Sequence, residues 1–182
     1  MKKKEYVFKI ALIGNSGVGK TSLLSRYQYD KYEGDYKPTL GASIVAKNVL
    51  ISTDEVEYNL RLVIWDLAGQ EKYETVRPLY FEGCIGAILV YDITRIPTFY
   101  KIKNKWLKDF TSYAKKNSDF ILIGNKSDLE DMRKVESSDG KKLADEIQAV
   151  SFIETSAKTG DNVNESFLFL VKHILRKSGE NI

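Results

Sequence analysis

The sequence predicts an α/β protein with a sheet of about six strands, mostly parallel, with one antiparallel strand and helices on both faces. Two observations predict this class. Short apolar, strand-like runs alternate with helical patterns along the 182 residues, which is the order expected of a parallel sheet covered by helices. The polar, glycine-containing segments come directly after apolar runs, where open α/β sheets bind their ligands.

Apolar periodicity indicates where each element lies. The run at 85–91 is continuously apolar, as expected of a central strand buried on both faces. A polar turn at 53–55 separates a mostly apolar run from a partly alternating one and predicts the antiparallel pair. Pro78 is expected to disturb the second helical pattern, at 71–81. The strands are predicted at 6–13, 43–51, 57–65, 85–91, 120–124 and 151–153, and the helices at 20–29, 71–81, 98–114, 138–148 and 162–176.

The first glycine-rich segment has the chemistry of a phosphate-binding loop. Residues 14–21 fit the pattern G-x-x-x-x-G-K-[ST], and they lie between a predicted strand and a predicted helix, as that pattern requires. The backbone N–H groups of such a loop, at the positive end of the following helix, form a nest for a polyphosphate. Lys20 then places an ammonium on the outer phosphates, and the Thr21 hydroxyl can ligate Mg²⁺. The alternative, a chance glycine-rich turn, is disfavoured by the flanking elements.

Three further residues extend this phosphate chemistry. Asp66 ends a predicted strand and can hold Mg²⁺ directly or through water, as a Walker-B carboxylate does. Gly69 allows a backbone N–H to approach the terminal phosphate, and Gln70 can orient a water for in-line attack. Thr39 lies in a polar surface loop, where its hydroxyl is a second candidate Mg²⁺ ligand. Outside this setting, each of these residues would be an ordinary turn or surface residue.

Two later segments have the chemistry to select the base. Asp128 can accept two hydrogen bonds from N1–H and the 2-amino group of guanine. Adenine would leave the carboxylate unpaired, at a cost on the order of a few kcal/mol. Lys126 can lay its aliphatic stem on the ring, and Asn125 can tie the loops together. At 156–158, the Ala157 N–H is a candidate donor to the guanine 6-oxo group.

Composition excludes several other classes. The net charge of +3 is too small to indicate nucleic-acid binding, and one cysteine excludes an internal disulfide. No apolar stretch is long enough to span a membrane. The last residues, 177–182, hold no cysteine for prenylation. We expect a cytoplasmic protein, with peripheral membrane attachment left open, through a partner or through a tail that this chain lacks.

Taken together, these motifs resemble those of Ras-superfamily small GTPases, and they are most similar to the Rab branch. The resemblance covers about 8–175, and its motifs appear in the family order and spacing at 14–21, 38–39, 65–71, 125–128 and 156–158. It implies one P-loop NTPase (small G) domain over 1–182, with a core of about 6–176 and short flexible termini. Leu67 replaces the usual Thr, and residues 40–44 and 71–76 differ from typical Rab switches.

The resemblance implies a role for each matching residue. Tyr32 should flank the base and Tyr36 should lie over the phosphates, with switch I at 30–42 and switch II at 66–81. The nucleotide-binding residues are then Ser16, Gly17, Val18, Gly19, Lys20, Thr21, Ser22, Tyr32, Tyr36, Thr39, Gly69, Asn125, Lys126, Asp128, Ser156, Ala157 and Lys158. The metal ligands are Thr21, Thr39 and Asp66; the catalytic residues are Gln70, Lys20, Gly69 and Thr39. Ile44, Trp65 and Tyr80 match the apolar patch that Rab effectors read, with Ile44 in place of the usual Phe.

The resulting hypothesis is a monomeric GTP-binding switch that hydrolyses GTP to GDP and phosphate with Mg²⁺ and thereby controls effector binding, in a role related to trafficking or membranes. The sequence offers no arginine finger in cis, so we expect slow turnover and an activating protein that supplies one. An exchange factor, the activating protein and an effector are expected at 30–44 and 66–81. Two alternatives remain: a nucleotide-binding interaction module with negligible hydrolysis, and an ATP-dependent kinase or ATPase.

Overall fold

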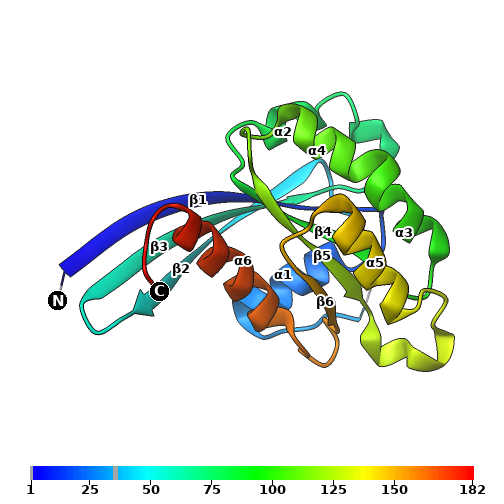
Figure 1. Cartoon of the computed structure of the whole chain (residues 1–182). Coiled ribbons are helices and arrows are strands. Elements are labelled where there is room, and N and C mark those ends of the chain that lie inside the picture. The colour runs from blue at the N-terminus through cyan, green and yellow to red at the C-terminus, as the bar shows by residue number, and fades with distance from the viewer. Residues whose placement is uncertain (1, 35–36) are drawn as a thin grey trace.

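A single six-stranded sheet forms the centre of the protein in a computed structural model that describes residues 2–34 and 37–182. The strand order is β2-β3-β1-β4-β5-β6. β2 runs antiparallel to β3, and all other neighbouring pairs are parallel. Figure 1 shows the sheet with its helices. The predicted mixed sheet with one antiparallel strand is therefore confirmed.

The elements alternate along the chain as the periodicity predicted. The strands are β1 (Lys2–Gly14), β2 (Ala42–Ser52), β3 (Val56–Leu67), β4 (Gly86–Asp92), β5 (Asp119–Asn125) and β6 (Phe152–Thr155). The α-helices are α1 (Lys20–Tyr29), α2 (Arg77–Phe81), α3 (Ile96–Lys101), α4 (Lys108–Tyr113), α5 (Ser137–Ile147) and α6 (Val163–Lys177). Three other helical segments are η1 (Glu71–Tyr73), η2 (Ile102–Leu107) and η3 (Ser127–Met132).

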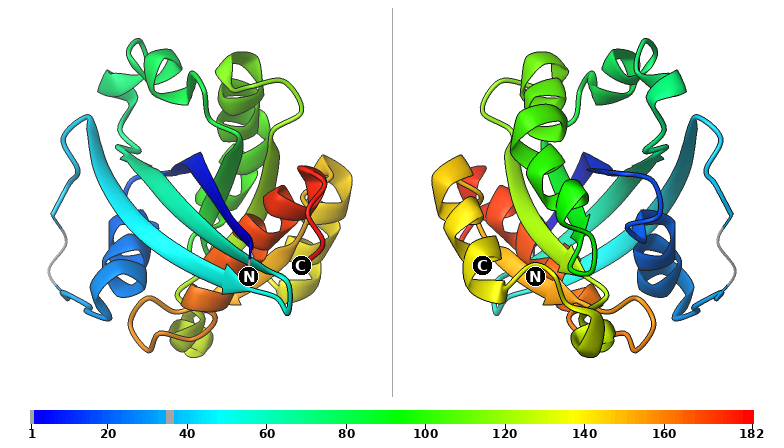
Figure 2. Two further views of the ribbon diagram at one scale, coloured as in Figure 1. Left: turned by 90° about the vertical axis from the view of Figure 1, so that its left-hand side faces the viewer. Right: turned by 90° about the vertical axis from the view of Figure 1, so that its right-hand side faces the viewer.

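Two hydrophobic cores fill the space between the sheet and its helices. On one face α1 and α6 pack against the strands, with the rings of Tyr27 and Phe167 stacked at 4.0 Å between centroids. On the other face α2, η2, α4 and α5 bury a second cluster that contains Phe81, Trp106 and Phe110. Figure 2 shows the helices divided between the two faces of the twisted sheet. The central strands β4 and β5 are buried on both sides, as their continuous apolar runs predicted.

β1 is longer than the apolar run predicted. It begins at Lys2 because it pairs in parallel with β3 from Lys2 opposite Val56 to Leu12 opposite Asp66. Pairing with β3 satisfies the backbone groups of the lysine-rich start, which the hydrophobic pattern could not foresee. β1, β2 and β3 consequently project beyond the other three strands, and both chain ends lie by this projection (Figure 1).

Two predicted helices differ from expectation. The pattern at 71–81 forms a short 3₁₀ turn, Glu71–Tyr73, and then α2, which begins at Arg77. Pro78 lies in the first turn of α2 and does not break the helix, because the first turn of a helix needs no backbone N–H. The pattern at 98–114 starts earlier, at Ile96, and contains the π-helical stretch η2. Such stretches are rare and frequently lie at functional sites.

Candidate functional site

The predicted base-binding segments meet the end of the phosphate loop in one cavity of about 320 Å³. It lies by the carboxyl edge of the sheet, between the start of α1 and the loops that follow β5 and β6. The lining residues come from four separate parts of the chain. They are Gly19, Ser22, Tyr32, Gly34, Asn125, Lys126, Asp128, Leu129, Ala157 and Lys158. All of them except Gly34 and Leu129 were predicted as nucleotide-binding residues from sequence.

The phosphate-loop segment turns tightly because its glycines adopt left-handed backbone angles. Gly17 and Gly19 have φ of 75° and 99°, a region that L side chains rarely adopt. A Cβ on Gly19 would lie 2.3 Å from Asn125 Nδ2, so only glycine fits there. The Lys20 ammonium donates to the carbonyls of Gly14, at 2.8 Å, and Asn15, at 2.9 Å. Burial lowers the pKa of Lys20 to about 8.

Three side-chain oxygens gather beside this loop. The Thr21 hydroxyl donates to Asp66 Oδ2 at 2.5 Å, and Thr21 Oγ1 lies 2.9 Å from Thr39 Oγ1. The second carboxylate oxygen of Asp66, Oδ1, is buried without a hydrogen-bond partner. Burial raises the pKa of Asp66, against the opposing hydrogen bond from Thr21 and the charge of Lys20. Oxygens of hydroxyl and carboxylate groups are the ligands that Mg²⁺ prefers, so this donor set fits the cation.

The segment after β3 passes against the phosphate-loop backbone. A Cβ on Gly69 would lie 2.3 Å from the Ser16 nitrogen, which leaves no room for a side chain. Gln70 follows directly, and its carbonyl accepts a hydrogen bond of 3.2 Å from Arg77 Nη2. Gln70 therefore lies on the phosphate side of the site, because the backbone at Gly69 passes close to the backbone of the phosphate loop.

Asn125 connects the loops around the cavity. Its Nδ2 donates to the Val18 carbonyl at 2.8 Å, and its Oδ1 accepts from Thr155 Oγ1 at 3.0 Å and from the Ala157 N–H at 3.4 Å. Asp128 Oδ1 accepts from the Ser156 hydroxyl at 2.6 Å. The hydrogen bonds made by Asn125 and Ser156 thus connect the phosphate loop with the segments that follow β5 and β6.

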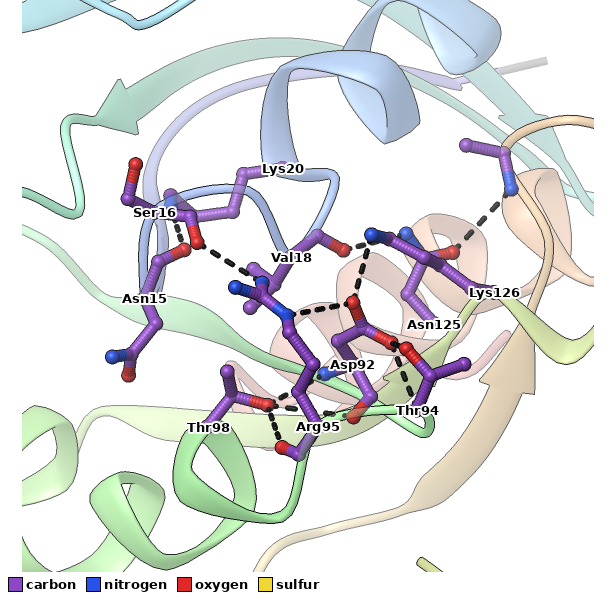
Figure 3. Close-up of polar contacts among 11 residues, drawn as sticks. Asn15, Ser16, Val18, Lys20, Asp92, Thr94, Arg95, Thr98, Asn125 and Lys126 are labelled. Carbon is purple, nitrogen blue, oxygen red and sulfur yellow. Dashed lines mark hydrogen bonds and ion pairs between the residues drawn. The ribbon is translucent and has the colours of Figure 1, made fainter. Parts of the chain in front are cut away.

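A carboxylate that the sequence analysis did not identify belongs to the same network of contacts. Asp92, at the end of β4, pairs through Oδ2 with Lys126 Nζ at 2.7 Å and with Arg95 Nε at 3.0 Å. Arg95 Nη2 reaches on to the Ser16 carbonyl at 3.0 Å, as Figure 3 shows. Burial acts to raise the pKa of Asp92, but hydrogen bonds from Lys126 and Thr94 hold it below its usual range. The available signal was position, since Asp92 follows an apolar strand at the same sheet edge.

The three predicted effector-surface residues form one continuous patch. Ile44 on β2 stands opposite Trp65 on β3 in the antiparallel register. The rings of Trp65 and Tyr80 lie 5.7 Å apart between centroids, and Ile44 is 55% exposed. Tyr36, predicted to lie over the phosphates, falls outside the described residues.

A phosphate loop that opens into a cavity lined by a carboxylate and an amide defines a class, the P-loop nucleotide-binding α/β proteins. The sequence matches the Ras family over residues 9–176. It is 44% identical to the Ras-related protein RABA6a of Arabidopsis thaliana over 170 residues, which are 93% of this chain and 70% of that protein. It is 40% identical to Ras-related protein Rab-13 of Canis lupus familiaris over 178 residues, 98% of this chain and 85% of that protein.

The chain belongs to the Ras family of small GTPases, and the relatives it matches are Rab proteins. It is accordingly a GTP-binding molecular switch that hydrolyses GTP. This membership confirms the predicted family and activity and argues against both alternatives, the non-hydrolysing module and the ATP-dependent enzyme. Within residues 2–34 and 37–182, no helix is long and apolar enough to cross a bilayer.

Proposed function

We propose that the chain is a Mg²⁺-dependent GTP switch whose site residues act in the roles that their positions support. The observation that carries this proposal is the oxygen cluster of Thr21, Thr39 and Asp66. Three segments far apart in sequence converge there beside the phosphate loop, and Asp66 Oδ1 is left buried and unpartnered. These three side chains would hold Mg²⁺, which when bound neutralises charge on the phosphate oxygens.

Hydrolysis depends on positioning and charge in this proposal. The Lys20 ammonium leaves the loop carbonyls of Gly14 and Asn15 for the outer phosphate oxygens. The loop N–H groups stabilise the charge that develops on the phosphoryl group. Gln70, brought close by the backbone at Gly69, orients the attacking water.

Guanine specificity is assigned to Asp128, which lines the cavity. Its carboxylate accepts from the base, and the hydrogen bond from Ser156 at 2.6 Å holds it in place. Tyr32 and the stem of Lys126 line the same cavity and flank the ring. The Ala157 N–H, held at present by Asn125, supplies the donor for the 6-oxo group.

Thr39 couples the nucleotide state to the surface. Its hydroxyl lies within 2.9 Å of Thr21 Oγ1, so release of the terminal phosphate would free the segment 30–42 and alter the patch of Ile44, Trp65 and Tyr80. An order–disorder change of this kind is an established form of switching. We infer that an effector binds that patch and that an exchange factor and an activating protein act at 30–44 and 66–81.

The activating protein would supply an arginine. Within the described residues, the two arginines whose charges act on Lys20 are already engaged: Arg77 by Asp109 and the Gln70 carbonyl, Arg95 by Asp92 and the Ser16 carbonyl. The Rab relatives support a role in membrane trafficking, with a cytoplasmic protein that attaches peripherally through a partner or a tail.

The test is single-turnover phosphate release from the GTP-loaded chain, beside ATP and with EDTA in place of Mg²⁺. We expect slow release with GTP and Mg²⁺ only, and a fall of about 10- to 100-fold for Gln70→Leu, because one positioned group contributes on that scale. An Asp66→Asn chain should lose most of the Mg²⁺ dependence. Equal release with EDTA, or from the Gln70→Leu chain, would overturn the assignments.

A further inference from the structure

Switch II contains a buried cation that the roles above leave unused. Arg77, the first residue of α2, is 2% exposed, although an arginine is almost never fully buried unless it is paired. Its Nη1 donates to Asp109 Oδ2 at 3.0 Å, with the Asp109 side chain 29% exposed. Its guanidinium carbon lies 4.5 Å from the centroid of the Trp106 ring. Burying a charge is costly, so this arrangement requires a reason.

The second guanidinium nitrogen indicates what the buried charge holds. Arg77 Nη2 donates to the main-chain carbonyl of Gln70 at 3.2 Å. This hydrogen bond therefore joins the start of α2 to Gln70, which precedes η1 and is the residue assigned to orient the attacking water. Arg77 is not among the residues that line the cavity, so its contact with Gln70 is its direct route to the reaction.

Trp106 carries the connection on to the phosphate loop. Its indole N–H donates to Asn15 Oδ1 at 2.7 Å, and the Asn15 carbonyl accepts from Lys20 Nζ. Trp106 is 1% exposed and belongs to the π-helical stretch η2. One face of the indole therefore supports the guanidinium of Arg77, while its edge holds the phosphate loop.

The geometry points to a positioning role, and we propose that Arg77 places Gln70 relative to the phosphate loop. Its guanidinium is anchored by Asp109 and stacked on Trp106, so the Gln70 carbonyl and Asn15 are held by one rigid group. Preorganisation of this kind matters because a misplacement of about 1 Å can cost about 100-fold in rate. The proposal rests on the role assigned above to Gln70.

Arg95 approaches the same loop in a different way. It holds the Ser16 carbonyl at 3.0 Å, but its side chain is 44% exposed and its partner is Asp92 (Figure 3). Through Asp92 it is linked to Lys126 of the base-binding segment, and within residues 2–34 and 37–182 it has no hydrogen bond or ion pair with Gln70. Of the two arginines, only Arg77 links switch II to the loop among the described residues.

A double-mutant cycle on the full chain tests the proposal. Single-turnover GTP hydrolysis with Mg²⁺ is measured for the unmodified chain, Arg77→Met, Gln70→Leu and the double variant, together with the dissociation constant for GTP. Met keeps the length and apolar character of the buried stem and removes the guanidinium. We expect Arg77→Met to slow hydrolysis about 10-fold with GTP affinity unchanged within about twofold. In the Gln70→Leu background it should cause no further slowing, because the two act as one unit.

The outcomes separate this inference from the proposed function. Slowing by Gln70→Leu without slowing by Arg77→Met overturns the inference and leaves Gln70 in its role. Equal slowing by Arg77→Met in both backgrounds also overturns it, since the effect would not pass through Gln70. A Gln70→Leu chain that hydrolyses normally overturns the role of Gln70 itself.

Two further variants decide the question if Arg77→Met does not fold. Trp106→Phe keeps an aromatic face under the guanidinium but removes the N–H donated to Asn15, and Asp109→Asn keeps an oxygen acceptor but removes its charge. Each should slow hydrolysis at least threefold, an effect absent in the Gln70→Leu background. Unchanged rates in both would overturn the proposal. Lys103→Met, which removes an exposed cation of η2 paired with Glu146, is the matched control and should change nothing.

Discussion

Gly69 shows how one residue without a side chain can determine the geometry of a site. Its backbone passes so close to the phosphate loop that a Cβ would lie 2.3 Å from the Ser16 nitrogen and 2.4 Å from the Asn15 carbonyl carbon. Real Cβ atoms do not approach backbone atoms so closely, and the neighbouring atoms here belong to main chain that cannot rotate aside. The loop and the segment after β3 would have to separate to admit a methyl group.

A Gly69→Ala chain should therefore lose both stability and rate. Overpacking of this kind costs about 1–3 kcal/mol, and displacement of Gln70 should slow single-turnover hydrolysis more than tenfold. Urea unfolding and phosphate release measure the two effects. Gly34→Ala is the control for stability, since no atom of the described residues lies within 4 Å of a Cβ there and its unfolding midpoint should stay unchanged. A Gly69→Ala chain as stable as the unmodified protein would contradict the close approach.

At the scale of elements, the packing of α1 against α6 supports the phosphate loop from behind. α1 begins at Lys20, so the helix that anchors the loop is itself held by its contacts with α6. The rings of Tyr27 and Phe167 stack almost in parallel, at 4.0 Å between centroids and 4° between planes. Phe167 is fully buried, whereas Phe169 on the same helix is 39% exposed.

We expect Phe167→Ala to destabilise the chain by about 3–5 kcal/mol, because it removes a buried ring and leaves a cavity. Phe169→Ala, the same change two residues away on an exposed face, should cost less than about 1 kcal/mol. Chemical denaturation of the two variants side by side gives the difference. Similar losses of unfolding free energy in both variants would mean that the packing of α1 against α6 does not stabilise the chain as proposed.

The helices around switch II illustrate where local pattern is insufficient. Apolar spacing predicted a helix at 71–81, disturbed by Pro78, and a helix at 98–114. The chain instead forms η1 and α2 in the first range, and α3, the π-helical η2 and α4 in the second. Arg77 and Trp106 fall within these altered segments. Their contacts to Gln70, Asp109 and Asn15 involve residues 7 to 91 positions away, which local periodicity does not encode.

At the scale of the whole molecule, both ends of the chain meet on the projecting strands. The carboxylate of Glu180 accepts hydrogen bonds from Lys4 Nζ at 2.6 Å, from the Tyr6 hydroxyl and from the Tyr58 hydroxyl at 3.1 Å. These partners come from β1 and β3. The hydrogen bond from Lys4, with those from Tyr6 and Tyr58, lowers the pKa of Glu180 to about 2, from 4.5.

This cluster predicts an acid-dependent loss of stability. Because the folded pKa of Glu180 is depressed, its contribution is complete above about pH 4.5 and disappears as the pH falls through 2. A Glu180→Gln chain should therefore melt at a lower temperature than the unmodified chain at pH 6, and the gap should close between pH 4.5 and 2. Thermal unfolding across this range measures it. Glu55→Gln, in the β2–β3 turn, should show no such gap; a gap independent of pH for Glu180→Gln would contradict the assignment.

The mixed sheet, the phosphate loop and the loop segments at the carboxyl edge could all be predicted, because each depends on local sequence. Strand–helix alternation sets the order of a parallel sheet, and that order alone brings the loops after β1, β3, β5 and β6 to one edge. The base-side cavity contains the predicted Asn125, Asp128 and Ala157 for this reason.

Only the tertiary structure determined the contacts between side chains that lie far apart in the sequence. Three contacts join distant segments: the ion pair of Asp92 with Lys126, the packing of Arg77 on Trp106, and the hydrogen bond of Glu180 with Lys4. The chemistry of each motif follows from its residue types and from its position after a strand, and both can be read from the sequence. Which charged groups end up buried together depends on how the two helical layers pack on the sheet, and that packing is a property of the folded chain as a whole.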